Sequence, residues 1–330
     1  MTLPSVELCA SGAPLETMDA NAVVISEPSR IELWELKLKE AGPSDIVVET
    51  AWSGISSGTE RKLFDGSMPP FPGLAYPLVP GYEAVGYVAQ TDEAETHAVG
   101  DLVFVPGAQC YSDAQGLFGA SASQLVTNAS RVVAVPSDLR EQATLLSLAA
   151  TAHHALALTK QHPPDLIIGH GVLGRLLARM SIAMGNAAPT VWETDRHRRN
   201  GGVGYEVTEA KRDTRSDFNC IIDASGADSI LNDGIGRLAT GGQLVLAGFY
   251  QAQLSFDFVP AFVREANIQI AREFQPEDIK AALALVKDGK LKLADLITHR
   301  AHAEDARSAY DTAFRDAGCV KMILDWRLEA

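Results

Sequence analysis

The chain has 330 residues, of which 46% are hydrophobic and 21% charged, and 28 Lys and Arg against 42 Asp and Glu give a net charge of −14. This composition is that of a folded globular protein, long enough for two domains, and it excludes a disordered, collagen-like or coiled-coil chain. The acidic balance argues against nucleic-acid binding, which depends on cationic contacts to phosphate, and against polybasic attachment to anionic lipid.

The cysteines and the N-terminus indicate a reducing compartment. Cys9, Cys110, Cys220 and Cys319 are far apart in the sequence, and no pair has the spacing of a zinc knuckle or redox motif. Residues 1–20 lack the basic and apolar regions of a signal peptide, and no run approaches the ~20 apolar residues of a membrane span. We expect a cytoplasmic protein without an integral membrane segment, in which residues 1–20 form a loose extension.

Residues 21–137 have the pattern of a β-rich domain. Short runs of β-branched and apolar residues are separated by Gly, Pro, Ser and Asp. These runs are 23–25, 46–48, 85–88 and 102–105. The segment 68–80 differs, because its prolines are incompatible with a regular helix or a central strand. We expect it to be a loop.

Residues 138–275 alternate between helical and strand patterns. A helix is predicted at 143–158, and an amphipathic helix follows the strand at 166–168 and stops near Gly185. Further strands are predicted at 190–193, 205–207, 220–223 and 244–247. This alternation is typical of a doubly wound parallel sheet, although the crossover at 207–217 is too short and polar for a full helix. Residues 276–330 then predict a helix opened by Pro276, a second helix at about 304–314 and a strand at 320–326.

A glycine motif carries the first functional signal. Gly169, Gly171 and Gly174 form a GxGxxG pattern that follows a predicted strand and opens a predicted helix. In a dinucleotide-binding turn, the first glycine allows the tight turn, the second lets a pyrophosphate approach, and the third lets helix and strand pack closely. The helix N-terminus then presents free N–H groups to the anion. The alternative is a glycine-rich turn used only for packing.

The choice between NAD and NADP depends on the residues after the next strand. Glu193 stands at the end of that strand, where a carboxylate accepts hydrogen bonds from ribose hydroxyls and repels a 2′-phosphate. Arg196, Arg198 and Arg199 follow, and could either surround a 2′-phosphate or form a solvated loop. We predict NAD as the cofactor.

The sequence resembles the medium-chain dehydrogenase/reductase superfamily. The matching segments are 81–86 (Gly-Tyr-Glu-Ala-Val-Gly), 100–103 (Gly-Asp-Leu-Val), the glycine motif and 297–299 (Ile-Thr-His). The resemblance implies an α/β fold, with a GroES-like β-barrel catalytic domain and a Rossmann domain built on a doubly wound parallel sheet. It places the catalytic domain at 21–137, the dinucleotide domain at 138–275 and a return to the catalytic domain at 276–330. The active site is expected in the cleft between them.

The sequence departs from the zinc-dependent members of that superfamily. The positions that match their three catalytic zinc ligands hold Ser56, Tyr82 and Ser147. None is a competent ligand, because zinc prefers thiolate, imidazole or carboxylate. The cysteine-rich structural zinc lobe is also missing. We therefore expect a member without a metal, whose proton chemistry depends on side chains.

Within the superfamily, the sequence more closely resembles the bacteriochlorophyllide dehydrogenase family of bacteriochlorophyll biosynthesis. The matching segments are 55–61, 68–73, 76–83, 104–107, 169–175, 190–194, 246–250, 274–278 and 321–326. This resemblance implies NAD-dependent oxidation of the 3-(1-hydroxyethyl) group of a bacteriochlorophyllide to 3-acetyl, so the substrate partner would be a tetrapyrrole. The superfamily also implies a homodimer formed through the edge of the dinucleotide sheet.

Oxidation of a secondary alcohol needs a base within about 3 Å of the hydroxyl. His153 is the candidate base, and its alternative is a hydrogen-bonded histidine at the domain seam. His154 is expected on a different side of the helix, so both should not serve. Tyr82 could donate to the alkoxide or merely fill the lost metal site. The remaining catalytic candidates are Ser56 and Thr59, as hydroxyls that orient the substrate or cap a turn, and Glu83, as a group that orients neighbours.

The resemblance also assigns binding residues. The expected cofactor-binding residues are Gly169, Gly171, Val172, Leu173, Gly174, Glu193, Thr151, Ser225, Ala247, Gly248 and Phe249. A large flat pigment needs aromatic and aliphatic walls. The candidates are Phe71, Pro72, Leu74, Tyr76, Phe118, Phe249, Tyr250 and Phe262, with the 68–80 loop as lid or floor, and Arg61 as partner of a substrate carboxylate. Ordinary packing is the alternative for each. His170 is a further candidate as a ligand of the pigment's magnesium, although a position in the glycine turn facing the cofactor is the favoured alternative.

Two other functions remain open. A zinc-free quinone or enoyl reductase of the same superfamily would consume NADPH with enones and leave the pigment alcohol untouched. A pigment carrier or dinucleotide-binding scaffold would bind without turnover. The intact glycine motif together with Glu193 favours an enzyme.

Overall fold

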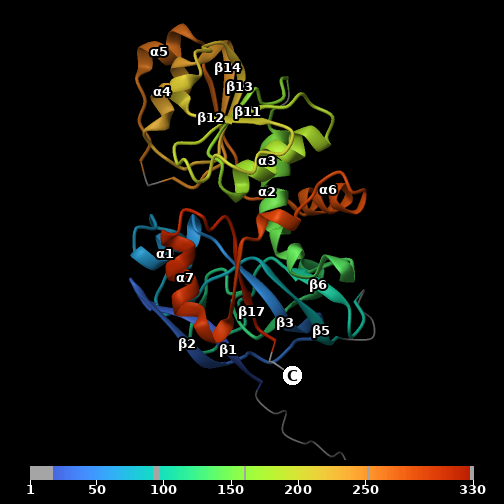
Figure 1. Cartoon of the computed structure of the whole chain (residues 1–330). Helices are drawn as coiled ribbons and strands as arrows, with labels where there is room; N and C mark the ends of the chain where they lie inside the picture. The colour runs from blue at the N-terminus through green and yellow to red at the C-terminus, as the bar shows by residue number, and fades with distance from the viewer. Residues whose placement is uncertain (1–17, 92–96, 160, 251–252, 328–330) are drawn as a thin grey trace, which may run out of the picture.

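The computed structural model describes residues 18–91, 97–159, 161–250 and 253–327. The expected N-terminal extension lies almost entirely outside these residues, and the first strand begins at Asp19. Figure 1 shows two lobes, with β1–β9, β16 and β17 in one and β10–β15 in the other. Helices α2 (Leu146–Ala157) and α6 (Pro276–Lys287) lie between them.

The first lobe contains two sheets. Its elements in chain order are β1 (Asp19–Glu27), β2 (Arg30–Lys37), β3 (Asp45–Ile55), α1 (Thr59–Asp65), β4 (Leu78–Val79), β5 (Ala84–Gln90), β6 (Leu102–Val105), β7 (Gln115–Gly116), β8 (Gln124–Asn128), the 3₁₀ turn at Ala129–Arg131 and β9 (Val133–Ala134). One sheet has the order β2-β1-β4-β7, and the other has β16-β17-β3-β5-β6-β9 with β8 paired to β3. Valines such as Val24, Val47 and Val103 are fully buried in a shared core. The expected β-rich barrel is confirmed.

The second lobe has one parallel sheet of six strands, in the order β12-β11-β10-β13-β14-β15. Its elements are β10 (Leu166–Ile168), α3 (Val172–Ala183), β11 (Thr190–Trp192), β12 (Glu206–Thr208), the 3₁₀ turn at Ala210–Arg212, β13 (Phe218–Asp223), α4 (Ile230–Gly236), β14 (Leu238–Leu246), α5 (Phe258–Val263) and β15 (Asn267–Ile270). Between β12 and β13 the chain forms this 3₁₀ turn and loop segments but no α-helix, which confirms the shortened crossover.

Helices cover both faces of this sheet. Successive residues of a strand point to opposite faces. Ile167, Ile222 and Val245 accordingly join the core that includes α2 and α3, while Ile168 and Ile221 join the core that includes α4. The expected doubly wound arrangement is therefore confirmed.

One helix boundary and one additional helix differ from the prediction. The helix expected from residue 143 begins at Leu146, because Ser137–Leu145 winds as a 3₁₀ stretch that is kinked at Arg140, where φ is +46°. The short helix α1 was not predicted. Gly185, with φ at +90°, follows α3 as expected.

The C-terminal elements return to the first lobe. After α6 come the 3₁₀ turn at Ala294–Leu296, β16 (His299–His302), the 3₁₀ turn at Ala303–Asp305, α7 (Ala306–Arg315) and β17 (Met322–Asp325). Strand β17 pairs with β3 antiparallel, so the end of the chain completes the barrel sheet. Helix α7 packs its Tyr310 and Phe314 with residues of β1 and α1. Residues from the two ends of the sequence therefore meet beside α1.

Candidate functional site

The glycine turn links β10 to α3. Gly169 has φ at +97°, a region that favours glycine, and a Cβ there would lie 3.1 Å from the Ser225 backbone. A Cβ on Gly174 would lie 1.8 Å from Gly169 O, so this position must be glycine for helix and strand to pack. A Cβ on Gly171 would meet no atom within 4 Å. Glycine is thus required for folding at positions 169 and 174. At Gly171 the turn instead leaves open space for a ligand, as a dinucleotide-binding turn requires.

Glu193 lies directly beside this turn. Its Oε2 accepts a hydrogen bond from His170 N at 2.9 Å, and its Oε1 accepts one from Asp195 N at 2.8 Å. A carboxylate oxygen can accept more than one hydrogen bond. Glu193 can therefore hold the turn and still accept from a ribose hydroxyl.

The three arginines after Glu193 have different surroundings. Arg199 forms an ion pair with Glu209, and Arg198 Nε donates to Ala317 O at 3.0 Å. Arg196 is exposed, and its Nε contacts the ring of His197 at 3.2 Å. They therefore do not form one cluster.

His170 fixes the loop after Glu193. Its side chain is fully buried, with Nδ1 2.6 Å from Arg198 O and Nε2 2.9 Å from the Tyr205 hydroxyl. Since a carbonyl can only accept, Nδ1 carries the hydrogen. Burial lowers the pKa of His170 to about 4, so the ring is neutral. With both nitrogens occupied, His170 is not placed to ligate the magnesium of a pigment.

Other expected cofactor residues lie at the carboxyl ends of neighbouring strands. Ser225 follows β13 and donates through its hydroxyl to Asp223 Oδ1 at 2.7 Å, and Gly248 N donates to Asp223 O at 3.0 Å. Val172 and Leu173 open α3. In parallel sheets, ligands bind outside these strand ends. The end of the sheet thus brings together the glycine turn, Ser225 and the segment Ala247–Phe249.

Tyr250, an expected pigment contact, is tied to the sheet. Its hydroxyl donates to the Asp223 carboxylate, and its ring packs against the core on the α4 side. Burial raises the pKa of Asp223. In this structure Tyr250 anchors the turn after β14.

The catalytic candidates of the barrel form a hydroxyl cluster. The Tyr82 hydroxyl donates to Ser56 Oγ at 2.7 Å, and Thr59 N donates to the same oxygen at 3.3 Å. Ser56 is buried and Tyr82 is half-buried. Burial, aided by the negative charge of Glu83, raises the pKa of Tyr82, so the phenol stays protonated. The cluster can hold a substrate hydroxyl.

Buried charges lie close to this cluster. Glu83 forms an ion pair with Lys321, and both side chains are almost completely buried. Burial raises the pKa of Glu83, and the charge of Lys321 opposes that rise. Glu60 is fully buried as well and accepts from Ser56 N at 3.2 Å. The sequence drew attention to Glu83 but to neither Lys321 nor Glu60.

The two histidines of α2 converge on one carboxylate of α6. His153 Nδ1 lies 2.6 Å from Asp278 Oδ1, and His154 Nδ1 lies 3.0 Å from Asp278 Oδ2. Burial favours a higher pKa for Asp278, but hydrogen bonds from Gln275 N and both rings outweigh it and lower that pKa. The prediction that His154 points away from His153 did not anticipate that both rings contact the same carboxylate. Asp278 is 125 residues from His153, so no local pattern could have revealed the contact.

The helix geometry separates His153 from its neighbours on α2. Ser147 and Thr151 are one turn apart, and the Thr151 hydroxyl donates to Ser147 O at 3.0 Å. His153 is rotated by about 120° from Ser147 around the helix axis. Among the described residues, the buried Ser147 Oγ has no hydrogen-bond partner. His153 therefore lies at the α2–α6 contact, on a different side of α2 from Ser147.

Aromatic rings connect the two lobes beside the hydroxyl cluster. The centroid of Tyr82 is 5.3 Å from that of Phe118, Phe118 is 6.2 Å from Phe71, and Phe71 is 6.5 Å from Phe249. Phe71 belongs to the proline-rich loop and Phe249 to the turn after β14. The expected wall residues Phe71, Phe118 and Phe249 thus lie together at the domain seam.

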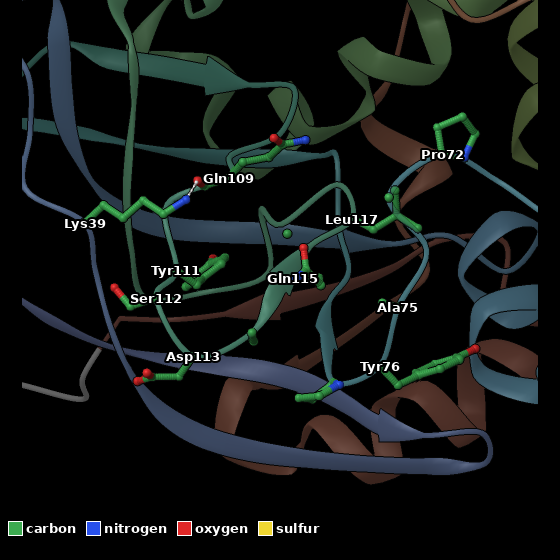
Figure 2. A pocket seen from close by; sticks show the side chains of 14 residues that line it. Lys39, Pro72, Ala75, Tyr76, Gln109, Tyr111, Ser112, Asp113, Gln115 and Leu117 are labelled. Atoms are coloured by element: carbon green, nitrogen blue, oxygen red, sulfur yellow. Dashed lines mark hydrogen bonds between the residues drawn. The ribbon is translucent and has the colours of Figure 1, made fainter.

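The other expected substrate contacts lie elsewhere. The Tyr76 hydroxyl donates to Leu63 O, and Arg61 Nη1 donates to Phe314 O at 3.2 Å. The barrel contains a pocket of about 450 Å³. Tyr76 and Lys39 lie on opposite sides of it (Figure 2). Lys39 Nζ donates to Gln109 O at 3.2 Å. None of the expected catalytic residues lines this cavity.

The residues present do not suit a catalytic zinc ion. The hydroxyls of Ser56 and Tyr82 are hydrogen-bonded to each other, and neutral hydroxyls are poor zinc ligands. Within the described ranges, no group of three or more His, Cys, Asp or Glu side chains is arranged to hold a metal. No step is therefore assigned to a metal.

Comparison with known proteins agrees with this geometry. The alcohol dehydrogenase GroES-like domain family matches residues 42–137. The 2-desacetyl-2-hydroxyethyl bacteriochlorophyllide A dehydrogenase of Rhodobacter capsulatus is 50% identical, covering 94% of this chain and 99% of its own. The enzyme of the same name from Cereibacter sphaeroides is 51% identical, covering 95% and 100%.

Solved structures share the fold. A putative zinc-binding dehydrogenase from Sinorhizobium meliloti, bound to NADP, superposes with a TM-score of 0.79 at 18% identity, covering 94% of this chain and 100% of its own. Within the described part of the chain, no helix is long and apolar enough to cross a bilayer. With half of its residues identical to both relatives over nearly its whole length, the chain belongs to the bacteriochlorophyllide A dehydrogenase family of the medium-chain dehydrogenase/reductase superfamily.

Proposed function

We propose that this protein oxidises the 3-(1-hydroxyethyl) group of a bacteriochlorophyllide to 3-acetyl, with NAD as hydride acceptor. The observation that carries the proposal is the identity of 50% and 51% to two bacteriochlorophyllide A dehydrogenases, over 94% and 95% of this chain. The hydroxyl cluster of Ser56 and Tyr82, beside the aromatic rings at the seam, is suited to a secondary alcohol on a flat macrocycle.

The residues around the glycine turn support a nicotinamide dinucleotide. The open space at Gly171, the free N–H groups that begin α3 and the carboxylate of Glu193 suit a pyrophosphate followed by a ribose. When bound, this cofactor supplies the hydride acceptor. Glu193 supports NAD over NADP, because its charge would repel a 2′-phosphate, while Arg199 is already paired with Glu209.

The substrate hydroxyl is assigned to Ser56 and Tyr82. Tyr82 Oη can accept the substrate proton while its own hydrogen is directed at Ser56 Oγ, 2.7 Å away. His153 is the competing base: with Nδ1 held by Asp278, its Nε2 is the nitrogen left to accept a proton. We favour the hydroxyl cluster, because Tyr82 packs against Phe118 in the aromatic row and His153 lies at the α2–α6 contact.

The aromatic row is proposed as the pigment-binding wall. Phe71 and Phe249 are each more than one-third exposed, so their rings remain available to a ligand. Because Phe71 belongs to the loop 68–80, the pigment would enter by displacing this loop from Phe249. Substitution of Phe71 should therefore raise KM for the pigment more than KM for the cofactor.

The molecule is proposed to act as a homodimer joined along β15. This strand is the edge of the six-stranded sheet, and edge strands present unpaired backbone groups. Beside it, Phe258, Phe262 and Val263 of α5, together with Ile270 of β15, expose 63–73% of their surfaces. A second copy would cover both the edge and these apolar side chains.

The function is tested by an anaerobic assay of purified protein with hydroxyethyl bacteriochlorophyllide and either NAD or NADP. We expect acetyl pigment and NADH in equal amounts, with NADP much less effective. Formation of neither product would reject the proposal. NADPH consumption with enones would instead support a reductase, and tight pigment binding without turnover would support a carrier.

A further inference from the structure

Glu60 is a buried acidic side chain beside the proposed substrate-binding hydroxyls. It lies in the first turn of α1, and its side chain is completely buried. Oε1 accepts a hydrogen bond from Ser56 N at 3.2 Å, and Oε2 accepts one from the Tyr310 hydroxyl of α7 at 2.8 Å. Burying a carboxylate is costly, so such a group is unusual beside a reaction site unless it has a role.

Ser56 connects this carboxylate to the hydroxyl cluster. Its amide contacts Glu60, while its Oγ accepts hydrogen bonds from the Tyr82 hydroxyl and from Thr59 N. A serine hydroxyl has two acceptor sites and one hydrogen to donate. With both acceptor sites used, the Ser56 hydrogen remains free. Among the described contacts, Ser56 reaches Glu60 through its amide and not through its hydroxyl, so proton transfer requires the Ser56 side chain to turn toward this carboxylate.

Several charged and titratable groups face Glu60 from the surrounding elements. Burial raises the pKa of Glu60 to about 8, and the negative charge of Glu83 adds to this rise. The hydrogen bond from Tyr310, the charge of Lys321 and the hydrogen bond from Ser56 N oppose it. Glu60 is thus poised to exchange a proton near neutral to mildly alkaline pH, as a proton acceptor should be.

We propose that Glu60 takes up the proton released by alcohol oxidation, and that it acts through Ser56 and Tyr82. The inference rests on the proposed function. The substrate O–H bond breaks as its proton passes to Tyr82 Oη, and the Tyr82 hydrogen passes to Ser56 Oγ. The Ser56 side chain then turns, and its hydrogen passes to the Glu60 carboxylate. A bound oxidised nicotinamide would accept the carbinol hydrogen together with its electron pair. The pigment becomes a ketone and Glu60 a neutral acid.

The test is the pH dependence of hydride transfer, followed in single turnovers by the pigment's absorption change. In the wild-type protein, the rate should rise with pH and level off above about 8, because the acceptor must be ionised. Glu60→Gln should lower the rate at least tenfold at high pH and remove this rise, with NADH affinity unchanged. Glu27→Gln, at an exposed ion pair with Arg30, is the matched control and should behave as wild type.

A second variant keeps the test decisive if Glu60→Gln does not fold. Tyr310→Phe removes one hydrogen bond to the carboxylate, which should raise the pKa of Glu60 and move the rate profile to higher pH. The inference would be overturned if the pH–rate profile of Tyr310→Phe matched that of wild type. It would also be overturned if the rate of Glu60→Gln still rose with pH as in wild type. Either result with an active wild-type protein leaves the proposed function intact, whereas an inactive wild-type protein rejects that function itself.

Discussion

At the scale of single residues, the resemblance to the superfamily matches Ser56 and Tyr82, two neutral hydroxyls, to positions where its zinc-dependent members bind metal. A metal binds and polarises an alcohol oxygen directly. In this structure Ser56 and Tyr82 are joined by a 2.7 Å hydrogen bond, and the acidic side chains of Glu60 and Glu83 are buried nearby. The account therefore requires that substrate deprotonation depends on Tyr82 and Ser56.

Replacement of Tyr82 tests this requirement. Tyr82→Phe keeps the ring packed against Phe118 but removes the hydroxyl, so we expect kcat to fall by about 10²-fold or more. NADH affinity, measured by fluorescence titration, should not change. His153→Ala should have the smaller effect on kcat. The reverse order would assign the proton to His153 and contradict the hydroxyl assignment.

Glu193 carries the prediction on cofactor choice. Glu193→Gln preserves the side-chain length and most of the hydrogen bonding to the glycine turn, but removes the charge that repels a 2′-phosphate. The ratio of the NADPH and NADH dissociation constants should shift toward NADPH by about tenfold, or 1.4 kcal/mol. An unchanged ratio would remove Glu193 as the residue that discriminates between the cofactors.

At the scale of elements, two glycines of the turn have different roles: Gly174 is needed for folding, and Gly171 for binding the cofactor. A Cβ on Gly174 would overlap Gly169 O, whereas a Cβ on Gly171 would meet no protein atom. Gly174→Ala should therefore cost about 1–3 kcal/mol of folding free energy or more. Gly171→Ala should keep the wild-type Tm and weaken NADH binding. Equal effects of the two variants on Tm would contradict the assigned roles.

The sequence predicts elements well where the signal is local. The hydrophobic alternation, the opening of α6 at Pro276 and the shortened crossover before β13 are all visible in short windows of sequence. Contacts between distant segments are not. The links from Asp278 to His153 and from Tyr310 to Glu60 join residues 125 and 250 positions apart, and only the folded chain brings them together. The arrangement around Ser56 could therefore be predicted only as a set of candidates.

At the scale of the whole molecule, buried titratable groups should make stability depend on pH in both directions. The folded chain holds a proton on Glu60 up to a pH of about 8, whereas an unfolded glutamate loses it near 4.5. Between these values the folded state binds more protons, so the free energy of unfolding falls as pH rises. Glu83, whose pKa is also raised by burial, acts in the same direction.

His170 acts in the opposite direction at lower pH. Its folded pKa is about 4 against an ordinary value of 6.5, so the unfolded state binds more protons between these values, and stability falls as pH drops. Below pH 6.5 the effects of Glu60 and His170 oppose each other, and above it Glu60 acts without His170. In urea unfolding from pH 4 to 9, Glu60→Gln should therefore flatten the fall in stability between about pH 6.5 and 8, and should make stability drop more steeply as the pH is lowered from 6.5 to 4.5. Parallel curves for the two proteins would show that Glu60 is ionised throughout.

The proposed dimer is a second property of the whole molecule. Phe258→Asp combined with Phe262→Asp places charges on the exposed apolar side chains of α5 without touching the core. Sedimentation should then change from dimer to monomer, while far-UV circular dichroism remains as in wild type. A wild-type protein that sediments as a monomer at micromolar concentration would refute the dimer.

The most direct test of the central claim follows the carbinol hydrogen. Hydroxyethyl bacteriochlorophyllide deuterated at the carbinol carbon is converted anaerobically with NAD, and the reduced cofactor is analysed by mass spectrometry. The account predicts one deuterium in NADH for each acetyl pigment formed, together with a slowed single-turnover rate. Acetyl pigment formed without deuterium in NADH, or no acetyl pigment at all, would contradict direct hydride transfer from this alcohol.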